Sequence, residues 1–153
     1  MIQDEWSRNL LKNRKDLKKK QLKRTIQAMN SAFPESNIEN FEDLITNIDL
    51  PDKDDRHVVA CAIKCNADLI VTFNIKDFPK EELSKFKIRL QSPDGLISNL
   101  IDIHPELVCI AFKKMVKRLK NPIKTNNEVL KSLTNCGLEK SIEKLKHCIK
   151  QNP

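Results

Sequence analysis

Acidic and polar residues flank two apolar runs that follow each other closely in this chain. Asp55 comes just before the apolar run 58–63, while Asn74 and Asp77 follow the apolar run 69–71. The first run is apolar on all sides, which is typical of a helix enclosed by protein. The second run is continuous, which is typical of a parallel strand covered on both faces. Ligands of α/β sheets bind beyond the carboxyl ends of strands, so these residues predict a site for a hard cation.

The same residues have a structural interpretation, and the residue types alone leave it open. Asp54 and Asp55 stand at the expected start of the helix, where aspartate caps backbone N–H groups and favours the helix dipole. Asn74 and Asp77 are equally typical of turns. His57, in the first turn of that helix, is expected to support the turn or to pack rather than to act as a base.

The stretch from Pro51 to Pro79 resembles the second half of a PIN domain. The similarity lies in Asp-Arg-His-Val-Val-Ala-Cys-Ala at 55–62 and Ile-Val-Thr-Phe-Asn-Ile-Lys-Asp-Phe-Pro at 70–79. It is greatest to the VapC-type toxin nucleases that carry an extra helical tail. The resemblance implies catalytic roles for Asp55, Asp77 and Asn74 around Mg²⁺ or Mn²⁺, with both aspartates as metal ligands.

Residues 2–12 are expected to form a helix with Ile2, Trp6 and Leu10 along one face. Glu5 lies beside that face, in Asp-Glu-Trp followed by Arg-Asn-Leu-Leu, and this pattern again resembles the family. The resemblance implies that Glu5 is a further catalytic acid and metal ligand. On residue type alone, Glu5 is an acid in the first helical turn that favours the helix dipole.

A strongly basic run covers residues 12–24 and leads into a helix that closes near Phe33. Its eight cationic residues are Lys12, Arg14, Lys15, Lys18, Lys19, Lys20, Lys23 and Arg24. Lys18, Lys19 and Lys20 are candidate RNA phosphate contacts, and the alternative is a solvated face. No aromatic residue interleaves with them, so contact with the RNA backbone is expected rather than base stacking. Arg56 is a further RNA-binding candidate, or an ion-pair partner of Asp52.

The remaining sequence predicts a packed connector, a short edge strand and a helical tail. The connector is 34–50; a helix at 81–86, a strand at 88–90 and helices at 92–101, 105–120, 126–134 and 138–151 follow. We expect a partial PIN-like domain at 1–92 and a helical subdomain at 93–153. The fold class is α/β, a three-layer PIN-like domain with a parallel sheet.

Composition limits the class of partner. The chain has 153 residues and a net charge of +7, which favours anionic partners. Its five cysteines form no C-x-x-C pair, so a set of zinc ligands is not indicated. The longest apolar runs are six residues, and the first residues lack the pattern of a secretory signal. A cytoplasmic protein without a membrane segment is expected.

The resemblance begins late in the family pattern. A PIN domain starts with an apolar strand that ends in an Asp, and no such strand precedes Glu5. The fold is therefore expected to be incomplete at its N-terminus, with low activity for this chain alone. An upstream start codon, a split gene and a decayed remnant are all compatible with the sequence.

The function implied by the resemblance is that of a Mg²⁺-dependent endoribonuclease, the toxin of a toxin–antitoxin pair. The alternative is a remnant that binds RNA or an antitoxin without cutting. Expected partners are RNA and an antitoxin protein, with a homodimer or a separate N-terminal fragment as further possibilities.

Overall fold

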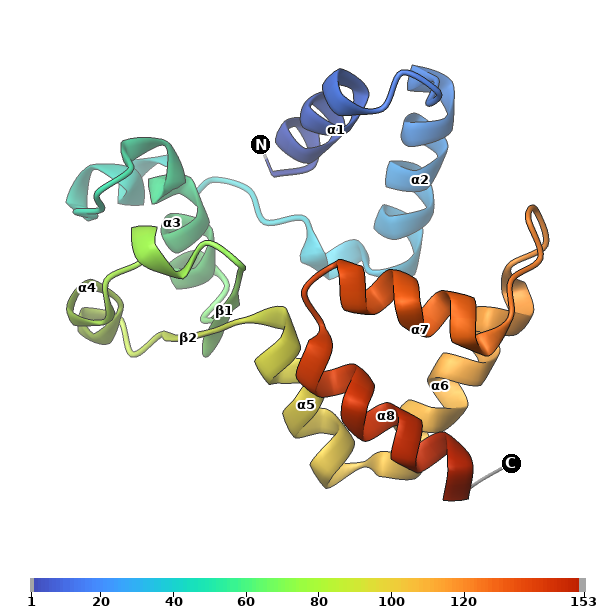
Figure 1. The fold of residues 1–153 in the computed structure, drawn as a ribbon. Coiled ribbons are helices and arrows are strands. Elements are labelled where there is room, and N and C mark those ends of the chain that lie inside the picture. Colours follow the sequence, from blue (N-terminus) through green and yellow to red (C-terminus); the bar gives the residue numbers. More distant parts are fainter. Residues whose placement is uncertain (1, 152–153) are drawn as a thin grey trace. The chain divides into compact units, whose positions relative to one another are not determined.

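A computed structural model describes residues 2–151, which form helices and one pair of short strands (Figure 1). The α-helices are α1 (Ile2–Asn13), α2 (Lys19–Ala32), α3 (Arg56–Lys64), α4 (Lys80–Lys85), α5 (Pro93–Ile103), α6 (Pro105–Arg118), α7 (Asn126–Asn135) and α8 (Glu139–Gln151). Short 3₁₀ turns occur at η1 (Pro34–Ser36), η2 (Glu42–Asn47), η3 (Lys53–Asp55) and η4 (Ile75–Asp77). The strands are β1 (Leu69–Val71) and β2 (Arg89–Gln91).

The described chain divides into two compact units. One comprises residues up to 70 together with 76–89, and the other comprises 71–75 and 90 onward. Helices α1 to α4 belong to the first unit, and helices α5 to α8 belong to the second.

The two strands run parallel. Arg89 N–H donates to the Asp68 carbonyl (2.9 Å), and Thr72 N–H, four residues after Asp68, donates to the carbonyl of Gln91, two residues after Arg89 (3.1 Å). Donation from alternate strands at this offset is the parallel pattern. The predicted α/β class with a parallel sheet is confirmed.

Strand β1 differs from the expectation of burial on both faces. Ile70 is buried and Leu69 is partly buried, but Val71 is 40% exposed. In the described residues the sheet has two strands, so β1 has a single neighbour and one end of it reaches solvent. The apolar run predicted the strand correctly and its burial incorrectly.

The core of the first unit collects apolar residues from segments far apart in sequence. Helix α3 buries Val59, Ala60 and Ala62, and the connector contributes Phe41, Ile48 and Leu50. The predicted packing of the connector on the core is therefore confirmed for these three residues. Helix α1 buries no side chain; a hydrogen bond from Gln3 Nε2 to Asn30 Oδ1 (2.7 Å) joins it to α2.

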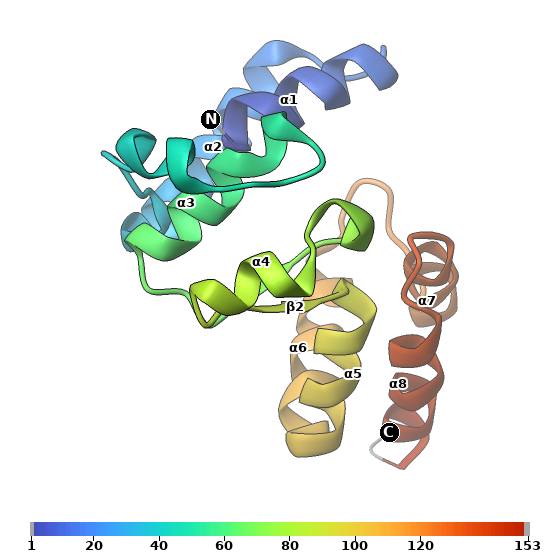
Figure 2. The same ribbon diagram turned by 90° about the vertical axis from the view of Figure 1, so that its left-hand side faces the viewer.

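The second unit is a set of four helices around one apolar cluster. Helix α5 packs against α8 and α6, as Figures 1 and 2 show from two directions. The buried members of the cluster are Ile101, Phe112, Val129, Leu130, Ile142 and Leu145. Helix α5 begins as predicted, with Ser92 Oγ accepting from Gly95 N–H (3.0 Å) and Pro93 in its first turn.

The break between α7 and α8 requires a glycine. Gly137 has a φ of 83°, and Leu138 N–H donates back to the Leu133 carbonyl (3.3 Å) to close the end of α7. A Cβ at Gly137 would lie 3.2 Å from Phe73 Cε1, so both backbone conformation and space favour glycine here.

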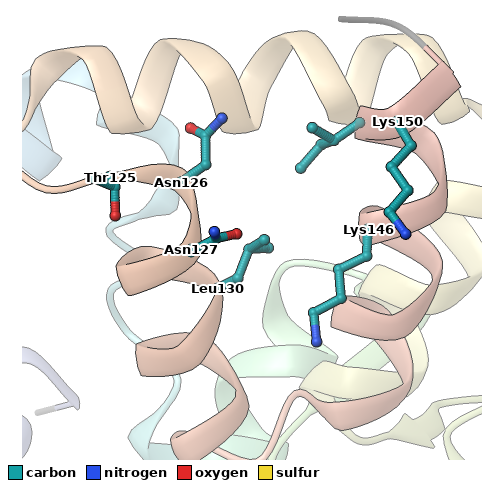
Figure 3. A pocket seen from close by; sticks show the side chains of 7 residues that line it. Thr125, Asn126, Asn127, Leu130, Lys146 and Lys150 are labelled. Carbon is teal, nitrogen blue, oxygen red and sulfur yellow. The ribbon is translucent and has the colours of Figure 1, made fainter.

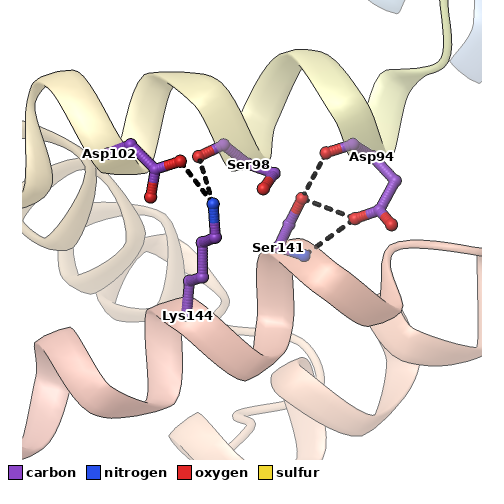
Figure 4. A network of polar contacts seen from close by, with 5 residues as sticks. All are labelled: Asp94, Ser98, Asp102, Ser141 and Lys144. Carbon is purple, nitrogen blue, oxygen red and sulfur yellow. Dashed lines mark hydrogen bonds and ion pairs between the residues drawn. The ribbon is translucent and has the colours of Figure 1, made fainter.

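A buried aspartate on α5 caps the start of α8. Asp94 accepts hydrogen bonds from the backbone N–H groups of Ser141 (2.8 Å) and Lys140 (3.1 Å) and from the Ser141 hydroxyl (2.6 Å) (Figure 4). Burial by itself raises the pKa of Asp94, but the bonds from Ser141 and Lys140 outweigh it and lower the pKa below its ordinary value. Further along the same interface, the Lys144 ammonium pairs with Asp102 at a more exposed position.

No single helix among residues 2–151 combines the length and hydropathy needed to cross a membrane. Helices α5 and α6 meet that criterion only as a pair, by length and composition alone, and their axes bend by 119° at the break between them.

Removing the Asp94 carboxylate should destabilise the second unit. We expect Asp94→Ala to lower the free energy of unfolding by about 2 kcal/mol, because the buried donors of Ser141 and Lys140 lose their acceptor. Since the folded pKa of Asp94 is lowered, its contribution is present above the ordinary carboxyl pKa and is lost as the pH falls through the folded value. Urea unfolding at neutral and acidic pH measures both effects.

The matched control is Asp102→Ala, which removes the carboxylate of the more exposed pair about two turns further along α5. Its cost should stay below about 1 kcal/mol. Equal costs for the two variants would contradict the assignment of Asp94 as the cap of α8.

Candidate metal centre

Three carboxylates come together in the first unit. One oxygen each from Asp52, Asp55 and Asp77 lies within 4.8 Å of the other two. Asp52 directly precedes η3, Asp55 ends η3 at the start of α3, and Asp77 ends η4. Asp52 is exposed, and the other two are partly buried.

The turn before α3 is built by its own side chains. Asp52 accepts from Asp54 N–H (2.8 Å), so the side-chain cap of η3 is Asp52. Asp55 occupies the N-cap position of α3 but forms no side-chain capping bond there. His57 Nδ1 lies 2.6 Å from the Asp54 carbonyl, and because a carbonyl oxygen only accepts, Nδ1 is the donor. His57 therefore supports this turn, as expected.

The core holds the two ends of the cluster in place. Val59 and Ala60, one turn after Asp55, have no exposed surface. Phe78, directly after Asp77, is also buried. Packed side chains that follow each aspartate thus hold the backbone that carries Asp55 and Asp77.

The electrostatics of the cluster show that Asp55 lies in an unfavourable place for an anion. Burial raises the pKa of its carboxyl, the charges of Asp52 and Asp77 raise it further, and Glu5 adds to the effect. His57 acts in the opposite direction. Nearby like charges and loss of water both disfavour the ionised form, so a cation at this position would relieve both effects.

Glu5 lies beside the cluster rather than in it. Its Oε2 atom is 3.7 Å from His57 Nε2, on a histidine side chain that is 12% exposed. That nitrogen is buried without a hydrogen-bond partner among the described residues. Of the three predicted metal ligands, the structure brings Asp55 and Asp77 together and adds Asp52 to them.

The other predicted site residues take separate positions. Asn74 belongs to the second unit, where its N–H donates to Thr72 Oγ1 (3.0 Å), and its role at the site stays a prediction. The guanidinium of Arg56 pairs with Asp49 at 4.0 Å rather than with Asp52, and its side chain is 22% exposed. Lys18, Lys19 and Lys20 are exposed at the start of α2.

Asp52 is the member of the cluster that sequence reasoning missed. The sequence indicated Asp52 only as an ion-pair partner of Arg56. The available signal was the spacing Asp52-x-Asp54-Asp55, because a 3₁₀ turn has three residues per turn and places Asp52 and Asp55 on the same side.

The donor set fits a hard divalent cation. All three groups offer carboxylate oxygens, which suit Mg²⁺ and Mn²⁺, and no sulfur or imidazole ligand belongs to the group.

Two segments of the chain match known protein families. Residues 2–76 match the family described as "PIN domain", and residues 93–147 match the family described as "VapC50 C-terminal domain". A curated relative from Mycobacterium tuberculosis (strain ATCC 25618 / H37Rv), named "Putative ribonuclease VapC50", is 33% identical over 79 residues. That alignment covers 52% of this chain and 47% of the relative, so the chain spans about half the length of that protein.

No solved structure matches the chain. The family matches and the curated relative give no support for a homodimer or a separate N-terminal fragment as partner. The two matched segments follow one another in the order that the resemblance at 51–79 implies, and this resemblance is confirmed. A match to the PIN domain followed by a match to the VapC50 C-terminal domain is the arrangement that fits a VapC-type PIN protein.

Proposed function

We propose that this protein is a metal-dependent endoribonuclease that acts as the toxin of a toxin–antitoxin pair in the cytoplasm. The observation that carries the proposal is the group formed by Asp52, Asp55 and Asp77 in a chain that matches the PIN domain. The relative named as a ribonuclease supports RNA as the substrate and an antitoxin as the protein partner.

Asp52, Asp55 and Asp77 are the residues that would hold a divalent cation, Mg²⁺ or Mn²⁺. When bound, such an ion supplies an activated water and compensates negative charge on the phosphate. The chain contributes three carboxylates that are already close before any ion arrives, and the raised pKa of Asp55 reflects their mutual repulsion.

Neighbouring residues support the positions and the charge of these carboxylates. His57 donates to the Asp54 carbonyl and so fixes the turn between Asp52 and Asp55. Glu5, close to the other nitrogen of His57, extends the negative field around Asp55. In this proposal Glu5 acts next to the ion-binding group, while a role for Asn74 as a ligand or water-orienting group stays a prediction from the sequence.

The phosphate backbone of RNA is repelled by an acidic site, so cationic residues must supply the binding energy. Lys18, Lys19 and Lys20 are exposed and form one continuous cationic segment. Arg56 directly follows Asp55 in the chain, and an RNA phosphate would compete there with Asp49. These four residues are the proposed RNA contacts.

Metal binding should stabilise the fold. At a hundredfold excess of Mn²⁺ or Mg²⁺ over the dissociation constant, we expect a gain of about 2.7 kcal/mol, seen as a higher melting temperature. Asp55→Asn should erase that gain. Because the folded pKa of Asp55 is raised, its ionised form opposes folding above the ordinary carboxyl pKa, and the same variant should be neutral or stabilising in chelator at neutral pH.

Two variants of Asp52 separate capping from charge. Asparagine caps as well as aspartate does, so Asp52→Asn should weaken the Mn²⁺ response while stability in chelator stays near that of the unchanged chain. Asp52→Ala should also lose about 1 kcal/mol in chelator, because the Asp54 N–H loses its acceptor. Thermal melts of the three proteins measure this, and an unaltered Mn²⁺ response in both Asp52 variants would exclude Asp52 as a ligand.

RNA cleavage should require both the cation and the aspartates. We expect cleavage of a labelled single-stranded RNA only with Mg²⁺ or Mn²⁺. The cleavage rate should fall about a hundredfold or more in Asp55→Asn and Asp77→Asn, because losing a metal ligand costs at least as much activity as losing a residue that only supports a ligand. The low activity expected for residues 1–153 stays a prediction, which the rate of the unchanged chain measures. If the chain binds RNA but does not cut it with Mg²⁺, with Mn²⁺ or without metal, the result would favour the non-catalytic binding module.

The lysines at 18–20 should determine the salt dependence of RNA binding. Replacing all three with Gln should reduce the slope of log affinity against log salt by about 2, at about 0.7 for each phosphate contact on a single strand. Fluorescence anisotropy with chelator present measures binding without cleavage. An unchanged slope would assign these lysines to the solvated surface.

A further inference from the structure

A pocket of about 400 Å³ opens between α7 and α8 in the second unit (Figure 3). Asn126 and Asn127 line it from the first turn of α7, and Lys146 and Lys150 line it from α8. Leu130 and Ile149 form its apolar part. With Thr125, five polar or cationic residues thus line a hollow that the candidate metal centre does not use.

The two lysines create a local excess of positive charge. They stand four residues apart on one helix, which places them one above the other on the same face. Within residues 2–151 neither ammonium lies at ion-pair distance from a carboxylate. Like charges at this spacing repel, and an anion between them would relieve that repulsion.

The nearby acid is already engaged. Glu128 accepts from the N–H (2.8 Å) and the hydroxyl (2.8 Å) of Thr125, which completes the capping box of α7. These bonds lower the pKa of Glu128, and the charge of Lys124 next to Thr125 lowers it further. Glu128 does not line the pocket, whose wall carries lysine, asparagine and threonine as polar residues.

The partner that suits such a wall is a polyanion with a repeating phosphate. Lysine ammonium groups bind phosphate as point charges, and asparagine amides donate hydrogen bonds to phosphate oxygens or sugar hydroxyls. From Leu90 onward the sequence has eleven Lys and Arg against six Asp and Glu, so the whole unit attracts such a partner.

We propose that the pocket between α7 and α8 binds the phosphate backbone of the RNA substrate, through Lys146 and Lys150. This inference rests on the proposed function, because it takes RNA as the substrate. It adds a second RNA contact surface, in the VapC50 C-terminal domain, to the lysines of α2.

The test compares two charge-matched double variants of the full chain. Lys146→Gln with Lys150→Gln removes the pocket cations, and Lys131→Gln with Lys140→Gln removes two exposed lysines of the same helices that do not line the pocket. Anisotropy of a labelled single-stranded RNA is recorded in chelator over a range of salt concentrations. Thermal melts verify that both variants fold.

We expect the pocket variant to lose roughly tenfold in RNA affinity at low salt and about 1.4 in the salt slope, as two lost phosphate contacts require. The control variant should lose much less. Equal losses in the two variants, or none in either, would overturn the proposal. Inorganic phosphate should inhibit RNA binding less in the pocket variant than in the unchanged chain. Equal inhibition of the two proteins would also overturn the proposal, because phosphate would then act elsewhere.

The same data separate this inference from the function on which it rests. If the unchanged chain binds RNA and the pocket variant binds it equally well, only the pocket assignment fails. If the unchanged chain does not bind RNA at any salt concentration, the ribonuclease proposal fails together with it.

Discussion

Carboxylates held within a few ångströms of one another repel, and the contacts around the start of α3 maintain Asp52, Asp55 and Asp77 against that repulsion. One compensation is local, because the Asp54 N–H donates to Asp52. The other comes from packing, because buried Val59 and Ala60 lie one turn after Asp55 and buried Phe78 directly follows Asp77. The core of the first unit therefore supplies the free energy that keeps these charges together. A site arranged in this way needs little reorganisation to receive a cation.

The second unit contains an aspartate in the opposite situation. Burial disfavours the charged form of Asp94 just as it disfavours that of Asp55. Asp94, however, receives three hydrogen bonds from Ser141 and Lys140, whereas the groups around Asp55 include three other carboxylates. The partners thus decide the direction of each pKa shift. Asp94 serves the helix packing of its unit, while an aspartate with a raised pKa among other acids is a mark of a functional site.

Sequence reasoning succeeded where the determinant is local. Ser92 and Pro93 marked the start of α5, Gly137 marked the break before α8, and the run 69–71 gave the bounds of β1 as the structure has them. Sequence reasoning failed for the exposure of Val71, because that exposure depends on how many strands neighbour β1 in the sheet. An apolar run does not encode this number.

The candidate site shows the same division between local and distant determinants. The family pattern pointed to Asp55 and Asp77, which the structure brings together. Asp52 was missed because its role depends on the tight η3 turn. The role of Glu5 as a metal ligand stays a prediction, because a helix face does not determine the distance to another element. The pairing of Arg56 with Asp49 depends on the course of the connector, which carries no regular pattern.

The charge of the whole chain complements its acidic centre. A group of carboxylates repels RNA, so a net charge of +7 must act on the substrate from other parts of the surface. Salt screens such attraction beyond about 10 Å at 0.1 M, so net charge guides an encounter but does not hold a bound strand. Holding requires cations that touch phosphates. In the VapC50 C-terminal domain, the pocket with Lys146 and Lys150 combines exposed ammonium groups with a concave wall, and this combination distinguishes a contact surface from a merely basic one.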